Sequence, residues 1–154
     1  VKSAPAALAQ LASLSREMWS GSIAAHNAYR SARALSAALA GASGADIAAF
    51  KARVDSLAPE TPRGRVRFRR RGPTAGPVTL IAASQAAMGA AMAMQTADVA
   101  PTATQVAGCA SAREQLRQTM ARWNALRTTQ LAALNASRTA AGLAPIVVPT
   151  VSGT

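Results

Sequence analysis

The sequence predicts an all-α protein, an antiparallel bundle of four helices. Half of the 154 residues are apolar but only 3% are aromatic, and alanine supplies most of the apolar total. Alanine combines the highest helix propensity with a small side chain, so a core that is rich in it must bring helix backbones close together. Four segments without an interior proline alternate with clusters of glycine and proline. These observations favour packed helices and disfavour a β-sheet.

The first long outer helix is expected at about residues 4–40. Pro5 is tolerated in a first turn, and no breaker follows before Gly41 except Gly21, which costs about 1 kcal/mol relative to alanine. Apolar and small residues recur every three or four positions, as in the seam of a bundle. The seam consists of Leu8, Leu11, Ser15, Met18, Ser22, Ala25, Tyr29, Ala32 and Ser36.

Two shorter helices are expected at about 45–58 and 78–97. The first has a regular apolar face and is ended by Pro59. The second carries no charge and has the length of a membrane span, about 20 residues. Its alanines offer little insertion energy, and Ala82, Ala86, Gly89 and Ala93 suit close helix approach, so we favour burial in the bundle over a membrane span.

The second long helix is expected at about 103–141, with Thr102 as its cap, Gly142 just past its end and Pro145 preventing its continuation. Its apolar stripe can continue through either Leu126 or Arg127. The bundle domain thus covers residues 1–142, and residues 143–154 form an extended tail. Five large side chains are the expected anchors of the core: Trp19, Tyr29, Phe50, Leu116 and Trp123.

The formal net charge of +11 is concentrated in a Pro/Gly/Arg linker at residues 59–77. Such a run can bind phosphate, a lipid headgroup or an acidic protein surface, or it can be a solvated connection. Nucleic acid is a poor fit, because Phe68 is the one aromatic residue there for base stacking. The candidate anion- or partner-binding residues are Arg63, Arg65, Arg67, Arg69, Arg70 and Arg71.

The sequence contains no catalytic constellation. Its six carboxylates are scattered over separate segments, which does not suit acid–base catalysis. His26 and Cys109 are the sole histidine and cysteine, so a metal site between the long helices would lack further ligands. We therefore expect no enzyme activity, no metal and no cofactor.

The last helix and its approach, "DVAPTATQ" and "LRQTMARWNALRTTQLAALNASRTAAGLAPI", carry a pattern with known parallels. They resemble the C-terminal helical region of bacterial sortilin-like (VPS10/BNR-repeat) β-propeller proteins, often labelled glycosyl hydrolases. No Asp-box repeat is present in this chain, so any active site of such relatives would lie elsewhere. The matching residues are Asp98, Pro101, Thr102, Trp123, Leu134, Asn135, Gly142 and Leu143.

Two hypotheses about function follow. The resemblance implies a non-catalytic scaffolding domain at the C-terminus of an exported, periplasmic or extracellular protein, whose partner is the propeller portion of the same precursor or another protein. The start at Val1 is consistent with a processed product or a piece of a longer chain. The alternative is an accessory subunit of a membrane-associated complex that docks through its arginines to anionic lipid or acidic protein surfaces.

Overall fold

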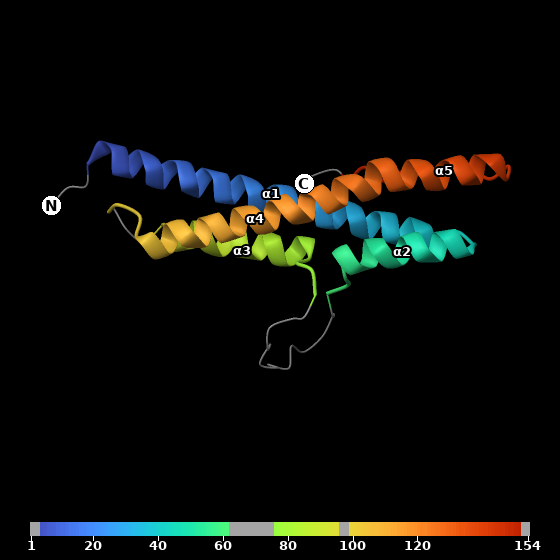
Figure 1. Cartoon of the computed structure of the whole chain (residues 1–154), viewed down its shortest axis with the longest axis horizontal. Coiled ribbons are helices and arrows are strands. Elements are labelled where there is room, and N and C mark those ends of the chain that lie inside the picture. The colour runs from blue at the N-terminus through green and yellow to red at the C-terminus, as the bar shows by residue number, and fades with distance from the viewer. Residues whose placement is uncertain (1–3, 62–75, 96–98, 152–154) are drawn as a thin grey trace.

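The computed structural model describes residues 4–61, 76–95 and 99–151, and within these ranges it contains helices and connections but no β-strand. The predicted all-α class is confirmed (Figure 1). The elements are α1 (Pro5–Ala40), α2 (Ala45–Leu57), α3 (Leu80–Ala93), α4 (Ala103–Ala125), a π-helical turn η1 (Leu126–Gln130) and α5 (Leu131–Ala140).

The helix ends follow the chemistry of the capping residues. Thr102 forms a capping box: its hydroxyl accepts from the Gln105 N–H at 3.2 Å, and Gln105 Oε1 accepts from the Thr102 N–H at 2.8 Å. Gly142, with φ +72°, takes the left-handed conformation after α5. Helix α3 is shorter than the predicted 78–97: it begins at Leu80, because Thr79 caps it by accepting from the Ala82 N–H at 3.3 Å, and it ends at Ala93.

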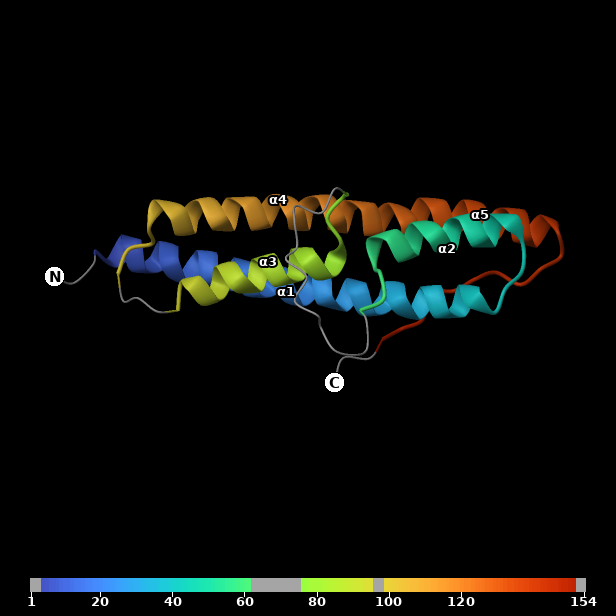
Figure 2. The same ribbon diagram turned by 90° about the horizontal axis from the view of Figure 1, so that it is seen from below.

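The long helices α1 and α4 lie side by side and run in the same direction (Figures 1 and 2). Glu17 contacts Arg113, and one turn further along both helices Gly21 lies against Leu116. Residue numbers therefore increase together along the two helices, which is the signature of a parallel pair.

Helices α2 and α3 run in the opposite direction and follow one another in a third row along the bundle (Figure 2). Tyr29 of α1 bonds to Pro59, whereas Ser36, further along α1, bonds to Asp55, so α1 and α2 are antiparallel. Gln105 and Arg122 of α4 likewise bond to the carbonyls of Ala93 and Val78, which makes α3 and α4 antiparallel.

The order of helices thus differs from a simple up-and-down bundle, in which each helix would reverse the previous one. Helices α2 and α3 have 13 and 14 residues, while α1 has 36. Placed end to end, the two short helices cover most of the apolar seam of α1, whereas side by side they would leave half of it exposed to water. Helix α3 therefore continues the row that α2 begins.

The core divides into two clusters along the length of the bundle. The first, which we call the small-residue half, joins the N-terminal half of α1 to α3 and the first part of α4. Its buried members are Met18, Ala87, Ala91, Met94, Cys109 and Ala112. The second, the large-residue half, joins the C-terminal half of α1 to α2 and to the end of the α4–α5 rod. Its large buried members are Leu35, Leu39, Ile47, Phe50, Val54, Leu57, Leu80, Trp123, Leu126, Leu131 and Leu134.

The π-helical turn η1 keeps the apolar stripe of the last rod facing the core. Leu126 and Leu131 are both buried although they lie five positions apart in the sequence. An α-helix would rotate Leu131 away from the face of Leu126, whereas a turn with i→i+5 hydrogen bonds absorbs the extra residue. The structure thus resolves the two alternatives for the stripe in favour of Leu126 and leaves Arg127 exposed.

The tail after Gly142 is non-helical as far as it is described, and it folds back along the bundle (Figure 2). The amide of Asn135 exchanges two hydrogen bonds with the backbone of Ile146, at 2.8 Å and 2.7 Å. Ile146 and Val148 then pack against the large-residue core. Arg138 Nε also donates to the carbonyl of Ala144 at 2.9 Å, so hydrogen bonds from two α5 side chains and two apolar contacts attach residues 143–151 to the bundle.

Candidate functional site

The six arginines predicted to bind an anion, at positions 63 to 71, lie outside the described residues. The described residues on either side of them line one hollow of about 480 Å³ midway along the bundle, between the end of α2 and the start of α3. The described residues on the two sides of the segment therefore lie close together on the bundle. The hollow is lined by Pro59, Glu60, Thr61, Gly76, Pro77, Val78, Thr79, Ile81, Ala82, Gln85 and Gln115.

Arginines from the two long helices hold both sides of this hollow. Arg33 Nη1 donates to the carbonyl of Ala58 at 3.2 Å, and its Nη2 pairs with Glu60 at 2.5 Å. Across the hollow, Arg122 Nη1 donates to the carbonyl of Val78 at 3.0 Å. Because charge-assisted hydrogen bonds fix each flank to a long helix, the attachment points of the arginine-rich segment have a defined position.

Asp55 is the centre of the polar network beside the hollow. Its carboxylate accepts from Arg33 at 3.0 Å, from Lys51 at 2.6 Å and from Ser36 at 2.5 Å. Partial burial raises the pKa of Asp55, but the hydrogen bonds from Lys51 and Ser36 and the two positive charges outweigh it, so the pKa lies below its ordinary value. This network joins α1 to α2 and holds a carboxylate that is satisfied internally.

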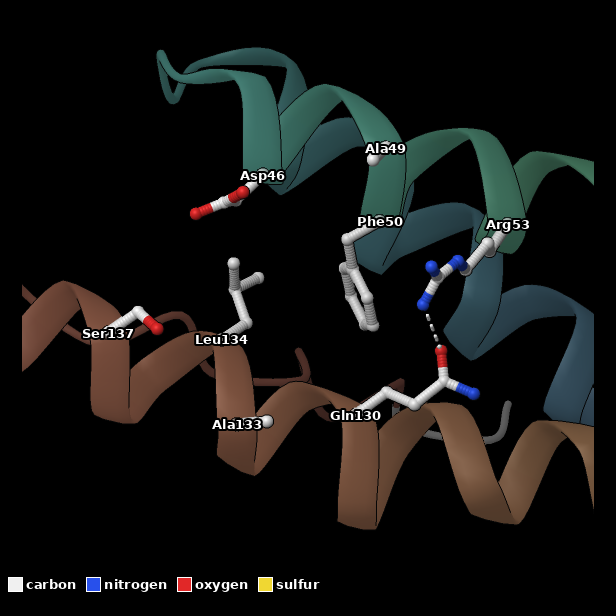
Figure 3. A pocket seen from close by; sticks show the side chains of 8 residues that line it. All are labelled: Asp46, Ala49, Phe50, Arg53, Gln130, Ala133, Leu134 and Ser137. Carbon is white, nitrogen blue, oxygen red and sulfur yellow. Dashed lines mark hydrogen bonds between the residues drawn. The ribbon is translucent and has the colours of Figure 1, made fainter.

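A second, open hollow of about 340 Å³ lies between α2 and the η1–α5 segment (Figure 3). Phe50 and Leu134 form an apolar floor, and Asp46 and Arg53 of α2 point into the gap. Arg53 Nη1 donates to Gln130 Oε1 across the gap at 3.0 Å. Sequence reasoning missed this hollow, because it requires α2 to lie beside α5, and no local pattern indicates that pairing.

An apolar surface that spans α1 and α3 is the third candidate. Ile23, Met88 and Met92 are 59%, 39% and 54% exposed, and Trp19 beside them is half-buried. The contact between Ser22 and Ser84 brings α1 and α3 together at this surface. Trp19 and Met88 each lie about one helical turn from that contact, toward the same end of the bundle. We call Trp19, Ile23, Met88 and Met92 the α1/α3 face.

His26 and Cys109, weighed as metal ligands in the sequence, do not meet. Cys109 is buried beside Met94, with 3.8 Å between their sulfurs, whereas His26 is exposed on α1 next to Tyr29. Burial raises the pKa of the Cys109 thiol, which disfavours the thiolate that a metal requires. Within the described ranges, no three residues among His, Cys, Asp and Glu gather in a way that could hold a metal ion.

The five side chains predicted to anchor the core differ in how deeply they are buried. Phe50 and Trp123 are buried in the large-residue core. Trp19, Tyr29 and Leu116 are half-buried and pack against the edges of the two clusters. Tyr29 thus lies at the edge of the large-residue cluster, and Trp19 and Leu116 lie at the edge of the small-residue cluster.

No family model, no curated protein and no solved structure matches this chain. Within the described residues, none of the helices combines the length and apolar character that crossing a bilayer requires.

Proposed function

We propose that this chain is a non-catalytic helical scaffolding domain that binds an acidic partner through its arginine-rich segment. The observation that carries the proposal is the distribution of charge. Among the described residues, the carboxylates of Glu17, Asp55, Glu60 and Glu114 already pair with cations of the same chain. The excess of positive charge in the chain is therefore available to an external anion.

The position of the segment supports the same function. Its two attachment points lie midway along a bundle held by close helix packing, and Arg33 and Arg122 fix them there. A guanidinium group binds carboxylate or phosphate through two hydrogen bonds in a planar fork, so a cluster of arginines suits the acidic surface of a protein. In this proposal the bundle presents the cluster and the cluster makes the contact.

The same proposal includes an identity for the partner, a β-propeller. The resemblance of the last helix to the sortilin-like family supports a partner that is the β-propeller portion of the same precursor, exported from the cell. The coding frame upstream of Val1 is the decisive observation for this part. Asp-box repeats encoded directly before Val1 would support it, and an upstream frame without them would refute it while leaving the binding proposal intact.

Charge-matched variants test the binding proposal. Replacing Arg63, Arg65 and Arg67 by serine removes three charges from the segment, and replacing Arg16, Arg127 and Arg138 removes three from the helices. With polyglutamate as the acidic probe, we expect the first variant to bind at least tenfold more weakly and the second less than threefold. Equal effects would mean that net charge alone governs binding, and the proposal would be wrong.

A second candidate is docking to an anionic membrane surface, and the α1/α3 face favours it. Exposed Ile23, Met88 and Met92 with a half-buried tryptophan supply the apolar contacts that interfacial binding uses, and the arginines supply attraction to the lipid. Co-sedimentation with phosphatidylglycerol vesicles tests it. The variant Ile23→Ser/Met92→Ser should lose vesicle binding and keep polyglutamate binding, and if both properties persist this candidate is rejected.

A further inference from the structure

The bundle holds the extended tail after α5 by hydrogen bonds to the tail backbone. Asn135 Nδ2 donates to the Ile146 carbonyl at 2.8 Å, and the Ile146 N–H donates to Asn135 Oδ1 at 2.7 Å. Arg138 Nε donates to the Ala144 carbonyl at 2.9 Å. Among the described residues, the hydrogen bonds between residues 144–151 and the bundle all end on backbone atoms of the tail. The bundle therefore binds this segment without recognising a polar side chain.

The contact at Asn135 has the pattern of a pair of β-strands. In an antiparallel ladder, the N–H and the C=O of one residue both bond to the residue opposite. The side-chain amide of Asn135 offers a donor and an acceptor in the same arrangement, so it substitutes for a neighbouring strand. Such a contact requires an extended residue with a free N–H, but it does not depend on the side chain of that residue.

The apolar side chains of the tail alternate in direction, as they do in a strand. Ile146 and Val148 pack against the large-residue core, whereas Val147 between them is 72% exposed. Pro145 and Pro149 bracket these residues, and proline disfavours the helical conformation both for itself and for the residue before it. The tail thus binds as an extended peptide with two apolar anchors.

The tail covers a side of the core that no helix covers. The backbones of α1 and α5 are not packed closely against each other, unlike those of α1 and α2, so core side chains fill the space between them. Helix α2 lies on one side of this space, and the tail crosses from α5 toward α1 on the other (Figures 1 and 2). We call Asn135, Arg138 and the part of the core beneath Ile146 and Val148 the tail seat.

We propose that the tail seat is a binding site for an extended apolar segment of a partner protein, and that the chain's own tail occupies it as an internal ligand. The partner segment carries apolar side chains at two alternate positions and a free N–H at the first of them. Backbone hydrogen bonds supply affinity and the two apolar contacts supply selectivity, as in recognition by strand addition. Because the tail and the partner segment compete for one seat, the tail opposes binding until it is displaced.

The tail is suited to displacement because its attachment is local. Its contacts with the core come from Ile146 and Val148, and both side chains are half-buried. Segments with few buried contacts open at a lower free energy than the whole fold. The tail is tethered at Gly142, beside the seat, which gives it an effective concentration on the order of millimolar. A free peptide therefore has to compete with this local concentration.

A labelled peptide with the sequence of residues 143–151 gives the first test, by fluorescence anisotropy. The receptor is the full chain with Ile146→Asp/Val148→Asp, whose own tail cannot fill the apolar part of the seat. It should bind the peptide at least tenfold more tightly than the wild-type chain, which must first release its tail. Adding Asn135→Ala to this receptor should weaken binding at least threefold, whereas adding Asn27→Ala, at an exposed position of α1, should leave binding unchanged.

Two changes in the peptide test which side chains the seat recognises. Ile146→Asp in the peptide should weaken binding at least tenfold, whereas Val147→Asp, with the same charge at the outward-facing position, should weaken it less than threefold. A receptor that binds the peptide no more tightly than the wild-type chain, or two altered peptides that bind equally, would overturn the proposal. The seat shares no residue with the arginine-rich segment, so Asn135→Ala should leave polyglutamate binding unchanged, and the two proposals fail separately.

Hydrogen exchange in the wild-type chain tests the proposal without any variant. The Ile146 N–H is bonded to Asn135 and should exchange when the tail is released, at least tenfold faster than the Trp123 N–H within the buried part of α4. An excess of the unlabelled peptide should accelerate exchange at Ile146 and leave Trp123 unchanged. Equal exchange rates at the two residues would mean that the tail leaves its seat only when the whole chain unfolds, and would refute an exchangeable tail.

Discussion

The two halves of the bundle share α1 but are held together in different ways. In the large-residue half, Leu, Ile, Phe and Trp side chains fill the space between α1, α2 and the α4–α5 rod. In the small-residue half, buried alanines line α3 where it faces α1 and α4. The same helix therefore uses bulky anchors at one end and close backbone approach at the other.

Close approach in the small-residue half brings polar and backbone groups into contact. Ser22 and Ser84 face each other across α1 and α3 with 3.1 Å between their hydroxyl oxygens, and Ser84 donates to the Ser22 carbonyl at 2.9 Å. Gly21 gives Leu116 the space that a Cβ would occupy. We therefore expect truncated side chains to lower the free energy of unfolding most in the large-residue half, and enlarged side chains to lower it most in the small-residue half.

The largest effect is expected from truncation in the large-residue half. Trp123→Ala removes a side chain that is 3% exposed, and should lower the free energy of unfolding by about 3–5 kcal/mol through lost burial and a cavity. Urea denaturation followed by circular dichroism measures this. Ile23→Ala, an exposed control, should change it by less than about 0.5 kcal/mol. Comparable losses in the two variants would contradict the assignment of the core.

Overpacking in the small-residue half comes next. Ala87→Leu adds atoms at a position that is 0% exposed between closely spaced helices, and should destabilise the fold by about 1–3 kcal/mol. Ala24→Leu, at an exposed position of α1, is the matched control and should be nearly neutral. Urea denaturation compares the two variants. A neutral Ala87→Leu would mean that the helices can separate without cost.

The serine pair should respond asymmetrically. Ser84→Ala leaves the buried Ser22 hydroxyl without the partner it has in the structure, and should cost about 1–3 kcal/mol. Ser22→Ala should cost less, because Ser84 keeps the Ser22 carbonyl as its acceptor. The double variant should be less destabilised than the sum of the single ones. Thermal unfolding of the wild type, the two single variants and the double variant measures the coupling energy between the two serines. If the effects of the single variants simply add up in the double variant, the two serines are not coupled.

Two glycines give opposite results when changed to alanine. Gly89→Ala should stabilise the protein by about 1 kcal/mol, because α3 is open there and alanine has the higher helix propensity. Gly21→Ala should stabilise the protein less than this or destabilise it, because the new methyl group meets the side chain of Leu116. Denaturation midpoints of the two variants provide the comparison, and equal stabilisation would show that Leu116 moves aside freely.

The smallest expected effect is the pH dependence of stability that Asp55 gives to the large-residue half. The pKa of Asp55 is lowered in the folded state, so its contribution to stability is present above its ordinary pKa, near 4, and is lost as the pH falls below that value. Its exposure limits the contribution to about 1 kcal/mol or less. Asp55→Asn should make stability less dependent on pH below about 4. Asp46→Asn, on the same helix, is the control for the change in charge.

The sequence predicted the helices well because their periodicity and end signals are local. The seam of α1, the cap at Thr102 and the left-handed Gly142 depend on neighbours within one or two turns. The η1 turn also left a local trace, the five-residue step from Leu126 to Leu131, which a strict three-or-four spacing concealed. The clamp between Asn135 and Ile146 left none, because an asparagine in a helix indicates no particular partner.

The arrangement of the helices was less predictable. The expectation that each helix reverses the previous one assumes short connections, whereas residues 58–79 join α2 to α3 and permit an end-to-end row. The hollow between α2 and α5 follows from that row and was missed with it. Trp19, Tyr29 and Leu116 were expected in the core but lie at the edges of the two clusters, because burial depends on how the helices pack and not on the local pattern.

The end-to-end row has a consequence for how the polypeptide can be divided. A protease cut between α2 and α3 would yield one fragment with α1 and α2 and another with α3, α4 and α5. Each fragment retains a helix that spans both clusters, and each cluster contains residues from both fragments. The two pieces would thus have the complementary surfaces needed to reassemble, which makes this position a natural place to split the protein into a reconstituting pair.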